Sequence, residues 1–170
     1  PRNDSIDLME STVLIDSSLI TNSGDKGISV GENSKALVYN SYLIKNLIGI
    51  AVKDKSTADV IHTDLEDNKL QISSYQKNWQ YGDGGAIDIF KSNFISRENN
   101  LKTDNKSSIN VFDSSFIGIV NKNGSKVYFD NNNNYNGNKI SLDKSITQKS
   151  QHPLYVYVKN VKNNHMRGSD

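Results

Sequence analysis

Short apolar runs recur along the chain at nearly regular spacing. Each run has three to five residues, alternates apolar with polar positions, and is bounded by Asn, Ser, Asp, Lys or Gly. Alternation with a period of two is typical of a half-buried β-strand, and no stretch keeps a 3.6-residue apolar period over three helical turns. The pattern therefore predicts an all-β chain made of many short strands and excludes helical repeats.

One motif repeats along the chain: a large apolar residue, a polar residue, and then Ser or Thr. The Ser or Thr stands at positions 17, 41, 63, 92 and 114, at intervals of 24, 22, 29 and 22 residues. One short apolar run precedes each motif and another follows it, so a repeat of about 22 residues holds three strands. A chain that stacks each strand on its equivalent one turn later is a right-handed parallel β-helix, in this case of about five to six turns. We expect the Ser and Thr side chains to stack into a hydroxyl ladder at one corner.

The repeat also divides the chain. Residues 1–130 are predicted to form the parallel β-helix. Residues 131–161 depart from the repeat, because a polar, Asn-rich stretch is followed by the alternating segment 153–161. The open end of a solenoid exposes an unpaired strand, so this region is predicted to be a C-terminal cap, with a last turn as the alternative. Residues 162–170 have the character of a tag or vector remnant.

Two stretches of the sequence, residues 27–34 and 48–56, resemble the right-handed parallel β-helix repeat domains of bacterial secreted and cell-surface proteins, as does the stretch from Tyr75 to Gly82. Some proteins of this type also carry a spore-coat-H-like kinase domain. The resemblance covers about residues 11–130 and implies a β-helix located outside the cell or at its surface. It implies no activity, because no catalytic motif of the pectate lyases, polygalacturonases or epimerases that share the β-helix is intact in this chain.

Composition narrows the function classes. The chain of 170 residues has no cysteine, which excludes disulfides, Cys-ligated zinc and thiol catalysis. The formal net charge is +1 and the lysines are dispersed, which argues against a nucleic-acid partner. No apolar run approaches the roughly 20 residues of a membrane-spanning helix. The three histidines lack the spacing of metal ligands, so no metal site is predicted from them.

A column of large apolar residues precedes the Ser/Thr corner in successive repeats. The residues before them are predicted to point inward, so alternation points the column outward. An exposed stripe of this size favours an interface with another chain or a platform for a glycan. The alternatives are a bend that turns the side chains inside, or a C-terminal segment that covers them. The column consists of Tyr39, Ile61, Phe90 and Phe112, with Ile15 and Phe129 as its ends.

The longest interval contains an insertion, residues 74–85, with several aromatic residues and a Gly-rich exit. Long loops in repeat proteins often carry function, and aromatic faces pack on the C–H surfaces of sugars. We therefore predict a ligand-binding site at Tyr75, Trp79 and Tyr81. The alternative is a loop that is folded onto the rod and held there by Trp79.

Asp59 and Asp88 occupy equivalent outward positions of adjacent repeats, which would bring their backbones to about 5 Å. Paired acids are what glycoside hydrolysis requires, so both are candidate catalytic residues. No cofactor is predicted, although the two acids and Asn110 are also candidate ligands of a calcium ion. The third interpretation is a pair of solvated surface acids. A sugar lyase would need a strong base and a cation in addition, and no Arg lies nearby in the sequence.

These patterns predict a non-catalytic binding or structural module whose partner is a polysaccharide or another protein chain, and the resemblance implies that it belongs to a bacterial secreted or cell-surface protein. Two alternatives stay open. One is a polysaccharide-active enzyme, a lyase or glycoside hydrolase, with its site near Asp59 and Asp88. The other is an assembly module that uses the exposed aromatic stripe. The sequence does not define the oligomeric state.

Overall fold

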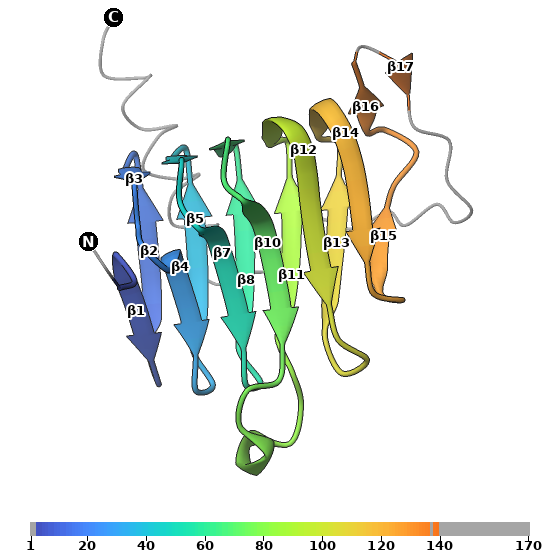
Figure 1. Ribbon diagram of the computed structural model, residues 1–170. Helices are drawn as coiled ribbons and strands as arrows, with labels where there is room; N and C mark the ends of the chain where they lie inside the picture. Colours follow the sequence, from blue (N-terminus) through green and yellow to red (C-terminus); the bar gives the residue numbers. More distant parts are fainter. Residues whose placement is uncertain (1–2, 137, 140–170) are drawn as a thin grey trace, which may run out of the picture.

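The computed structural model describes residues 3–136 and 138–139, and the regular elements in this range are β-strands and one short 3₁₀ helix (Figure 1). The strands wind into a parallel β-solenoid of about six turns of about 22 residues, which confirms the predicted fold class. In Figure 1 the front strands run downward, the strands behind them run upward, and the turns advance to the right. The coil is therefore right-handed, the usual hand of parallel crossover connections.

Each complete turn contributes one strand to sheet B, a short corner strand, and one strand to sheet A. Sheet B consists of β2 (Thr12–Asp16), β5 (Lys35–Tyr39), β8 (Thr57–Ile61), β11 (Ala86–Phe90), β13 (Ser108–Phe112) and β15 (Val127–Phe129). Sheet A consists of β1 (Ile6–Met9), β4 (Lys26–Gly31), β7 (Ile48–Lys53), β10 (Leu70–Tyr75), β12 (Asn93–Thr103), β14 (Ser115–Asn123), β16 (Asn134–Tyr135) and β17 (Asn138–Lys139). The corner strands β3 (Leu19–Thr21), β6 (Tyr42–Ile44) and β9 (Asp64–Glu66) pair with one another and then with β12. The 3₁₀ helix η1 (Trp79–Tyr81) lies between β10 and β11.

Side chains from all faces meet in one narrow core along the axis of the rod. Equivalent residues of successive turns stack on one another; on sheet A, Ile28, Ile50, Ile72 and Leu101 follow in register and are fully buried. A single turn cannot bury its own apolar side chains, so this stacking supplies most of the burial that stabilises the fold. This register, which shifts by one residue between Ile95 and Glu98 of β12, also sets where the outward-facing side chains lie.

The predicted hydroxyl ladder is present at one corner. Each Ser or Thr hydroxyl oxygen accepts a hydrogen bond from the backbone N–H of its counterpart one turn earlier, as Ser92 Oγ does from Thr63 at 3.1 Å. The prediction for the first member is wrong. Strand β2 places Asp16 opposite Tyr39, so the ladder begins at Ser18, whose N–H bonds to Ser41, and not at the exposed Ser17.

The apolar column points away from the core as predicted, but the expected exposure is wrong. Ile61, Phe90 and Phe112 follow core-facing residues and form a separate apolar cluster with Leu37. Their side chains are buried, and Tyr39 is half-buried.

The two ends proposed for this column are also wrong. Ile15 lies opposite Val38 and Phe129 opposite Val111, so both occupy core-facing positions. In each case a one-residue slip in the motif comparison reverses the direction of the side chain.

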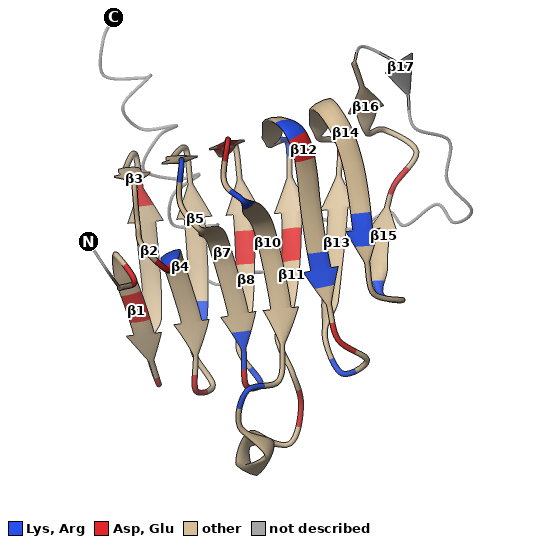
Figure 2. Cartoon of the chain, in the orientation of Figure 1, with Lys and Arg blue, Asp and Glu red and all other residues tan. Residues whose placement is uncertain are grey.

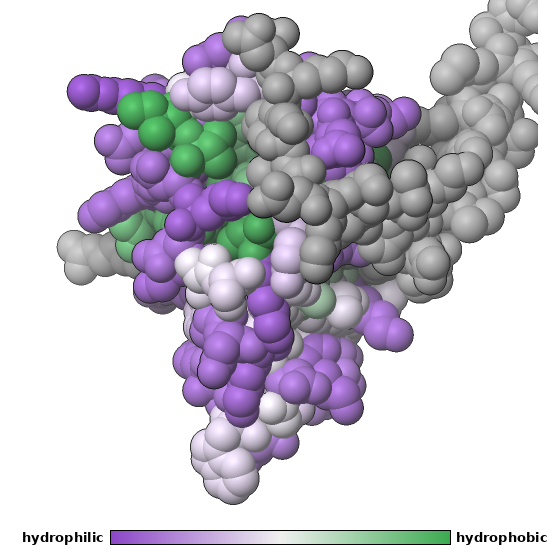
Figure 3. All heavy atoms as spheres, turned by 90° about the vertical axis from the view of Figure 1, so that its right-hand side faces the viewer, coloured by the Kyte–Doolittle hydropathy of each residue, from purple (hydrophilic) through white to green (hydrophobic). Residues whose placement is uncertain are grey.

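At the far end of the rod, β16 still pairs in parallel with β14, which extends the solenoid beyond residue 130. The rest of the predicted cap, residues 140–161, and the tag-like residues 162–170 lie outside the described residues. Seen from this end, the described surface is mostly hydrophilic, with hydrophobic residues in small separate areas (Figure 3). Within the described residues, no helix has the length and apolar character needed to cross a membrane.

Candidate functional site

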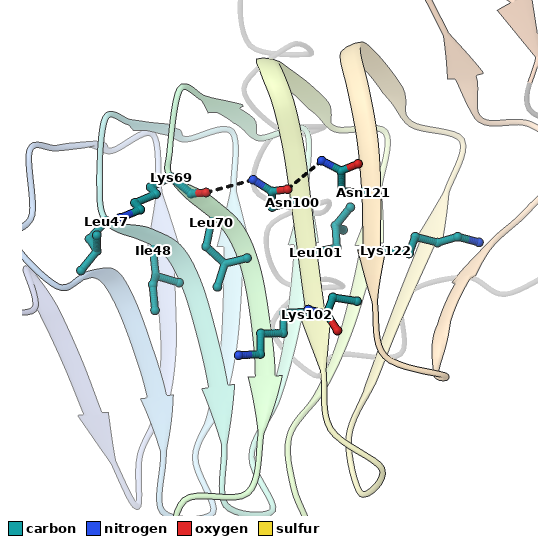
Figure 4. Close-up of a pocket in the computed structure, with 10 residues that line it drawn as sticks. Leu47, Ile48, Lys69, Leu70, Asn100, Leu101, Lys102, Asn121 and Lys122 are labelled. Carbon is teal, nitrogen blue, oxygen red and sulfur yellow. Dashed lines mark hydrogen bonds between the residues drawn. The ribbon is translucent and has the colours of Figure 1, made fainter.

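A groove runs over the outer face of sheet A. It consists of two adjoining hollows of about 570 Å³ and about 520 Å³, which share Ile48, Leu70 and Lys102. Ile48 and Leu70 are opposite each other on β7 and β10, and both are half-buried, so they give the groove an aliphatic floor. Figure 4 shows these two side chains on neighbouring strands, with Lys69 and Lys102 on either side of them. Because the lining residues come from successive strands, the groove follows the axis of the rod.

A short ladder of side-chain amides lies along one side of the first hollow. Asn100 and Asn121 are opposite each other on β12 and β14. Asn121 Nδ2 donates to Asn100 Oδ1 at 3.0 Å, and Asn100 Nδ2 donates to the Lys69 carbonyl oxygen at 3.2 Å (Figure 4). These bonds hold both amides in place at the surface, where their remaining donor and acceptor positions can bind a polar ligand.

Positive charge gathers along this groove (Figure 2). Lys69 and Lys102 are exposed, and the described residues that line the first hollow include no carboxylate. Lys26, in the second hollow, is different because it forms ion pairs with Asp25 and Asp4. Burial alone would lower the pKa of Lys26, but these carboxylates raise it overall. The charge left to attract a ligand is therefore concentrated at Lys69 and Lys102.

Lys122 also lines the first hollow, but its side chain points away from the groove floor, unlike those of Lys69 and Lys102 (Figure 4). It is opposite Leu101, a core position, and its Nζ lies 5.0 Å from the centre of the Phe129 ring. In Figure 4 its side chain extends away from Ile48 and Leu70. Its register position thus places its aliphatic stem over the last stacked core residues, and the cation–π contact holds its ammonium group near Phe129 and away from the groove floor.

The predicted ligand-binding residues are divided between the groove and the loop. Tyr75 is the last residue of β10 and lines the second hollow half-buried. Burial raises the pKa of its hydroxyl group and outweighs the opposite effect of Lys26, so Tyr75 stays protonated and can donate a hydrogen bond. Trp79 and Tyr81 belong to η1, on the loop that projects beyond the end of β10 (Figure 1).

The base of this loop is held by carboxylates and not by Trp79, whose side chain is 79% exposed. Asp54 is fully buried, and its Oδ1 accepts hydrogen bonds of 2.7 Å from the backbone N–H groups of both Lys77 and Asn78. Asp104 Oδ2 accepts another from the Gln76 N–H at 2.7 Å. The alternative in which Trp79 fastens the loop to the rod is therefore wrong.

The hydrogen bonds at Asp104 also affect its ionisation. Burial alone would raise the pKa of Asp104, but hydrogen bonds, first of all that from the Gln76 N–H, lower it overall. Asp104 therefore keeps its negative charge, and with it the stronger hydrogen bond to the loop, to lower pH than an ordinary aspartate. The hydrogen bonds of Asp54 and Asp104 therefore hold the base of the loop in place at the end of β10.

Asp59 and Asp88 are adjacent, as predicted. They lie opposite each other on β8 and β11 and appear as two acidic bands side by side in Figure 2. Burial raises the pKa of Asp88, a hydrogen bond of 2.7 Å from Asn110 Nδ2 opposes this, and the charge of Asp59 raises it further. The pair is on sheet B, so it and the groove of sheet A are separate surfaces.

The described residues contain no group of three or more His, Cys, Asp or Glu side chains that could hold a metal ion. The calcium interpretation of Asp59 and Asp88 therefore has two carboxylates and the Asn110 amide as its protein ligands, below the six to eight oxygens that calcium takes. Any such ion would depend mostly on water for its coordination.

Sequence reasoning missed the groove. Lys69, Lys102, Asn100 and Asn121 are scattered along the chain, and dispersed lysines and asparagines are typical of solvated surfaces and turns. The repeat spacing does not reveal the pair either: 22 residues would place Asn100 opposite Lys122, and only a register shift between Ile95 and Glu98 of β12 brings it opposite Asn121. Comparison of the chain with protein-family models, with curated proteins and with solved structures finds no match.

Proposed function

We propose that this protein is a non-catalytic carbohydrate-binding module of a bacterial secreted or cell-surface protein, and that the groove of sheet A is its binding site. One observation carries the proposal: an aliphatic floor of Ile48 and Leu70 lies between hydrogen-bonding groups at Lys69, Lys102 and Asn100. Sugars present apolar C–H faces and hydroxyl groups at the same time, so a sugar site combines apolar contact with a few placed polar groups.

The shape of the groove suits a polymer. Its lining comes from β7, β10, β12 and β14, which follow one another in sheet A. Neighbouring strands are about 4.8 Å apart, so four strands give a groove at least about 14 Å long. An extended polysaccharide chain laid along the rod would contact several turns at once, with apolar contacts at β7 and β10 and polar contacts at β12 and β14.

The proposal is tested by binding to a glycan array, followed by calorimetric titration of the strongest ligand with the full chain. Lys102→Ala and Tyr75→Ala should each weaken binding by roughly tenfold, the effect of losing one hydrogen bond to a charged or partly buried group. Lys35→Ala is the matched control, because Lys35 is also an exposed lysine and lies on sheet B. The proposal fails if no glycan binds, or if the sheet A variants bind as tightly as the control.

Trp79→Ala tests whether the loop belongs to the same site. The second hollow extends to Gln76, the first residue of the loop, so a ligand long enough to leave the groove at this end would approach η1. A weaker affinity for long glycans with an unchanged affinity for short ones would place Trp79 at the end of the site. Equal affinities for all lengths would exclude Trp79 from it.

A second candidate function, glycoside hydrolysis, has one observation in its favour. Such enzymes use one protonated and one ionised carboxyl group, and burial together with Asp59 raises the pKa of Asp88. The discriminating measurement is the release of reducing ends from the polysaccharides that bind. Release that is lost in Asp88→Asn would support an enzyme, whereas binding without release supports the non-catalytic module.

A further inference from the structure

An apolar strip on the outer face of sheet B is shielded from water although it points away from the core. We define the outer strip as Leu37, Tyr39, Ile61, Phe90 and Phe112, with Leu14 at its edge. The exposed fraction is 0% for Leu37, 2% for Ile61, 8% for Phe90 and 3% for Phe112. Phe90 and Phe112 stack with ring centres 4.9 Å apart, so the strip is continuous across turns.

Lateral neighbours alone do not account for this burial. A side chain on an uncovered sheet contacts the residues beside it, but its outer end stays open to solvent. Among the described residues, the apolar members of the cluster all come from β2, β5, β8, β11 and β13, which are strands of the same sheet. The cover over the strip must therefore come from another part of the chain or from another molecule.

We propose that the outer strip is the docking site for the chain's own segment 153–161. This segment lies outside the described residues, and it contains the densest run of large apolar side chains in residues 140–170. Leu154, Val156 and Val158 alternate with Tyr155 and Tyr157, so an extended segment would turn an aliphatic edge to the strip. The inference concerns sheet B and is independent of the proposed glycan groove.

The dimensions fit this occupant. The strip crosses five strands of sheet B, a distance of about 19 Å at about 4.8 Å per strand. Nine extended residues reach about 30 Å, and the 13 residues from 140 to 152 reach up to about 43 Å from the last described strand. The segment is long enough to cover the strip, and the connection is long enough to bring it there.

The charges beside the strip fit as well. Asp59 and Asp88 precede Ile61 and Phe90 by two positions and lie on the same outward face. The segment carries Lys159 directly after its aliphatic run and has no acidic residue. A segment without acidic residues can lie beside the acidic pair without like-charge repulsion, which favours this segment over an acidic one.

The absence of cysteine in the chain makes thiol labelling a direct test. Val156→Cys and Val158→Cys in the full chain are labelled with a maleimide, and Thr57→Cys, an exposed position of β8, is the accessible reference. Docking should slow the labelling of positions 156 and 158 by at least about tenfold relative to position 57, as burial behind a local opening step requires. Adding Phe90→Ser should restore rapid labelling, whereas Ile117→Ser, which alters an exposed apolar residue of sheet A, should not.

Circular dichroism verifies that each variant keeps the solenoid, and Ile61→Thr replaces Phe90→Ser if the latter does not fold. Rapid labelling of positions 156 and 158 in the otherwise unchanged chain would overturn the proposal. Slow labelling that neither Phe90→Ser nor Ile61→Thr relieves would also overturn it, because the segment would then be buried elsewhere. A dimer in light scattering that Phe90→Ser dissociates would assign the strip to a second copy of the chain and overturn it too.

Discussion

Asn110 donates a hydrogen bond of 2.7 Å to Asp88 across one turn of the solenoid. The two residues are 22 positions apart and are neighbours only because β11 and β13 pair in register. The same register places Asp59 on the other side of Asp88, so one carboxyl group has an amide donor on one side and a like charge on the other. The stability of this arrangement depends on pH.

Asp88→Asn should stabilise the protein at neutral pH. Burial raises the folded-state pKa of Asp88 above its unfolded value, so its favourable contribution is present below the unfolded pKa and is lost as the pH rises through the folded pKa. Asparagine keeps an oxygen for the Asn110 amide and removes the charge, which should raise the free energy of unfolding at pH 7 by up to about 1 kcal/mol. The gain should disappear below about pH 4 in urea titrations. Equal gains in the free energy of unfolding at pH 7 and below pH 4 would contradict this account. Asp113→Asn, which makes the same change at an exposed corner, is the control.

Asp54→Ala should release the base of the aromatic loop. The substitution removes the acceptor of the Lys77 and Asn78 N–H groups, each worth about 0.5–1.5 kcal/mol and more when a charged acceptor is lost. Hydrogen exchange at residues 77–81 should accelerate while the core strands stay protected. Asp54→Asn, which retains the acceptor oxygen, should show a smaller effect; unchanged exchange in Asp54→Ala would mean that other contacts hold the loop.

Ser92→Ala tests the hydroxyl ladder and its register. Ser92 Oγ accepts from the buried Thr63 N–H at 3.1 Å and donates to the Phe90 carbonyl oxygen at 2.9 Å. Loss of the hydroxyl leaves a buried donor unsatisfied and should lower the free energy of unfolding by about 1–3 kcal/mol. Ser17→Ala, at the exposed position outside the ladder, should change it by less than about 0.5 kcal/mol. A similar loss for both serines in chemical denaturation would argue against the observed register.

Gly118→Ala and Gly82→Ala separate two reasons for glycine. Both residues have positive φ, 101° and 87°, but a Cβ at Gly118 would overlap the Ser96 carbonyl oxygen, whereas a Cβ at Gly82 would have no atom of the described residues within 4 Å. Gly82→Ala should therefore cost only the backbone strain of about 1–3 kcal/mol that a side chain meets in a sparsely populated φ/ψ region. Gly118→Ala adds a backbone clash and should lower stability by more than about 3 kcal/mol in thermal unfolding. Comparable losses would show that strain alone matters at both sites.

The candidate residues show how far the repeat can be used for prediction. The repeat predicts that Asp59 and Asp88 are neighbours because their two turns match closely, and the structure pairs them. It places Ser17 one residue away from the true ladder position because the first turn resembles the others less closely, and a motif comparison tolerates a slip of one. The burial of Phe90 does not follow from the repeat, because alternation predicts which way a side chain points but not what covers it.

The sequence by itself determined the solenoid, its turn length and most of its register. Short alternating runs spaced about 22 residues apart can bury their apolar sides only by stacking on equivalent runs of the next turn. Only the tertiary structure decided where a groove forms and which outward face is shielded. Those properties depend on side-chain lengths, on contacts such as that between Asn100 and Asn121 across turns, and on which surfaces of the rod receive a cover.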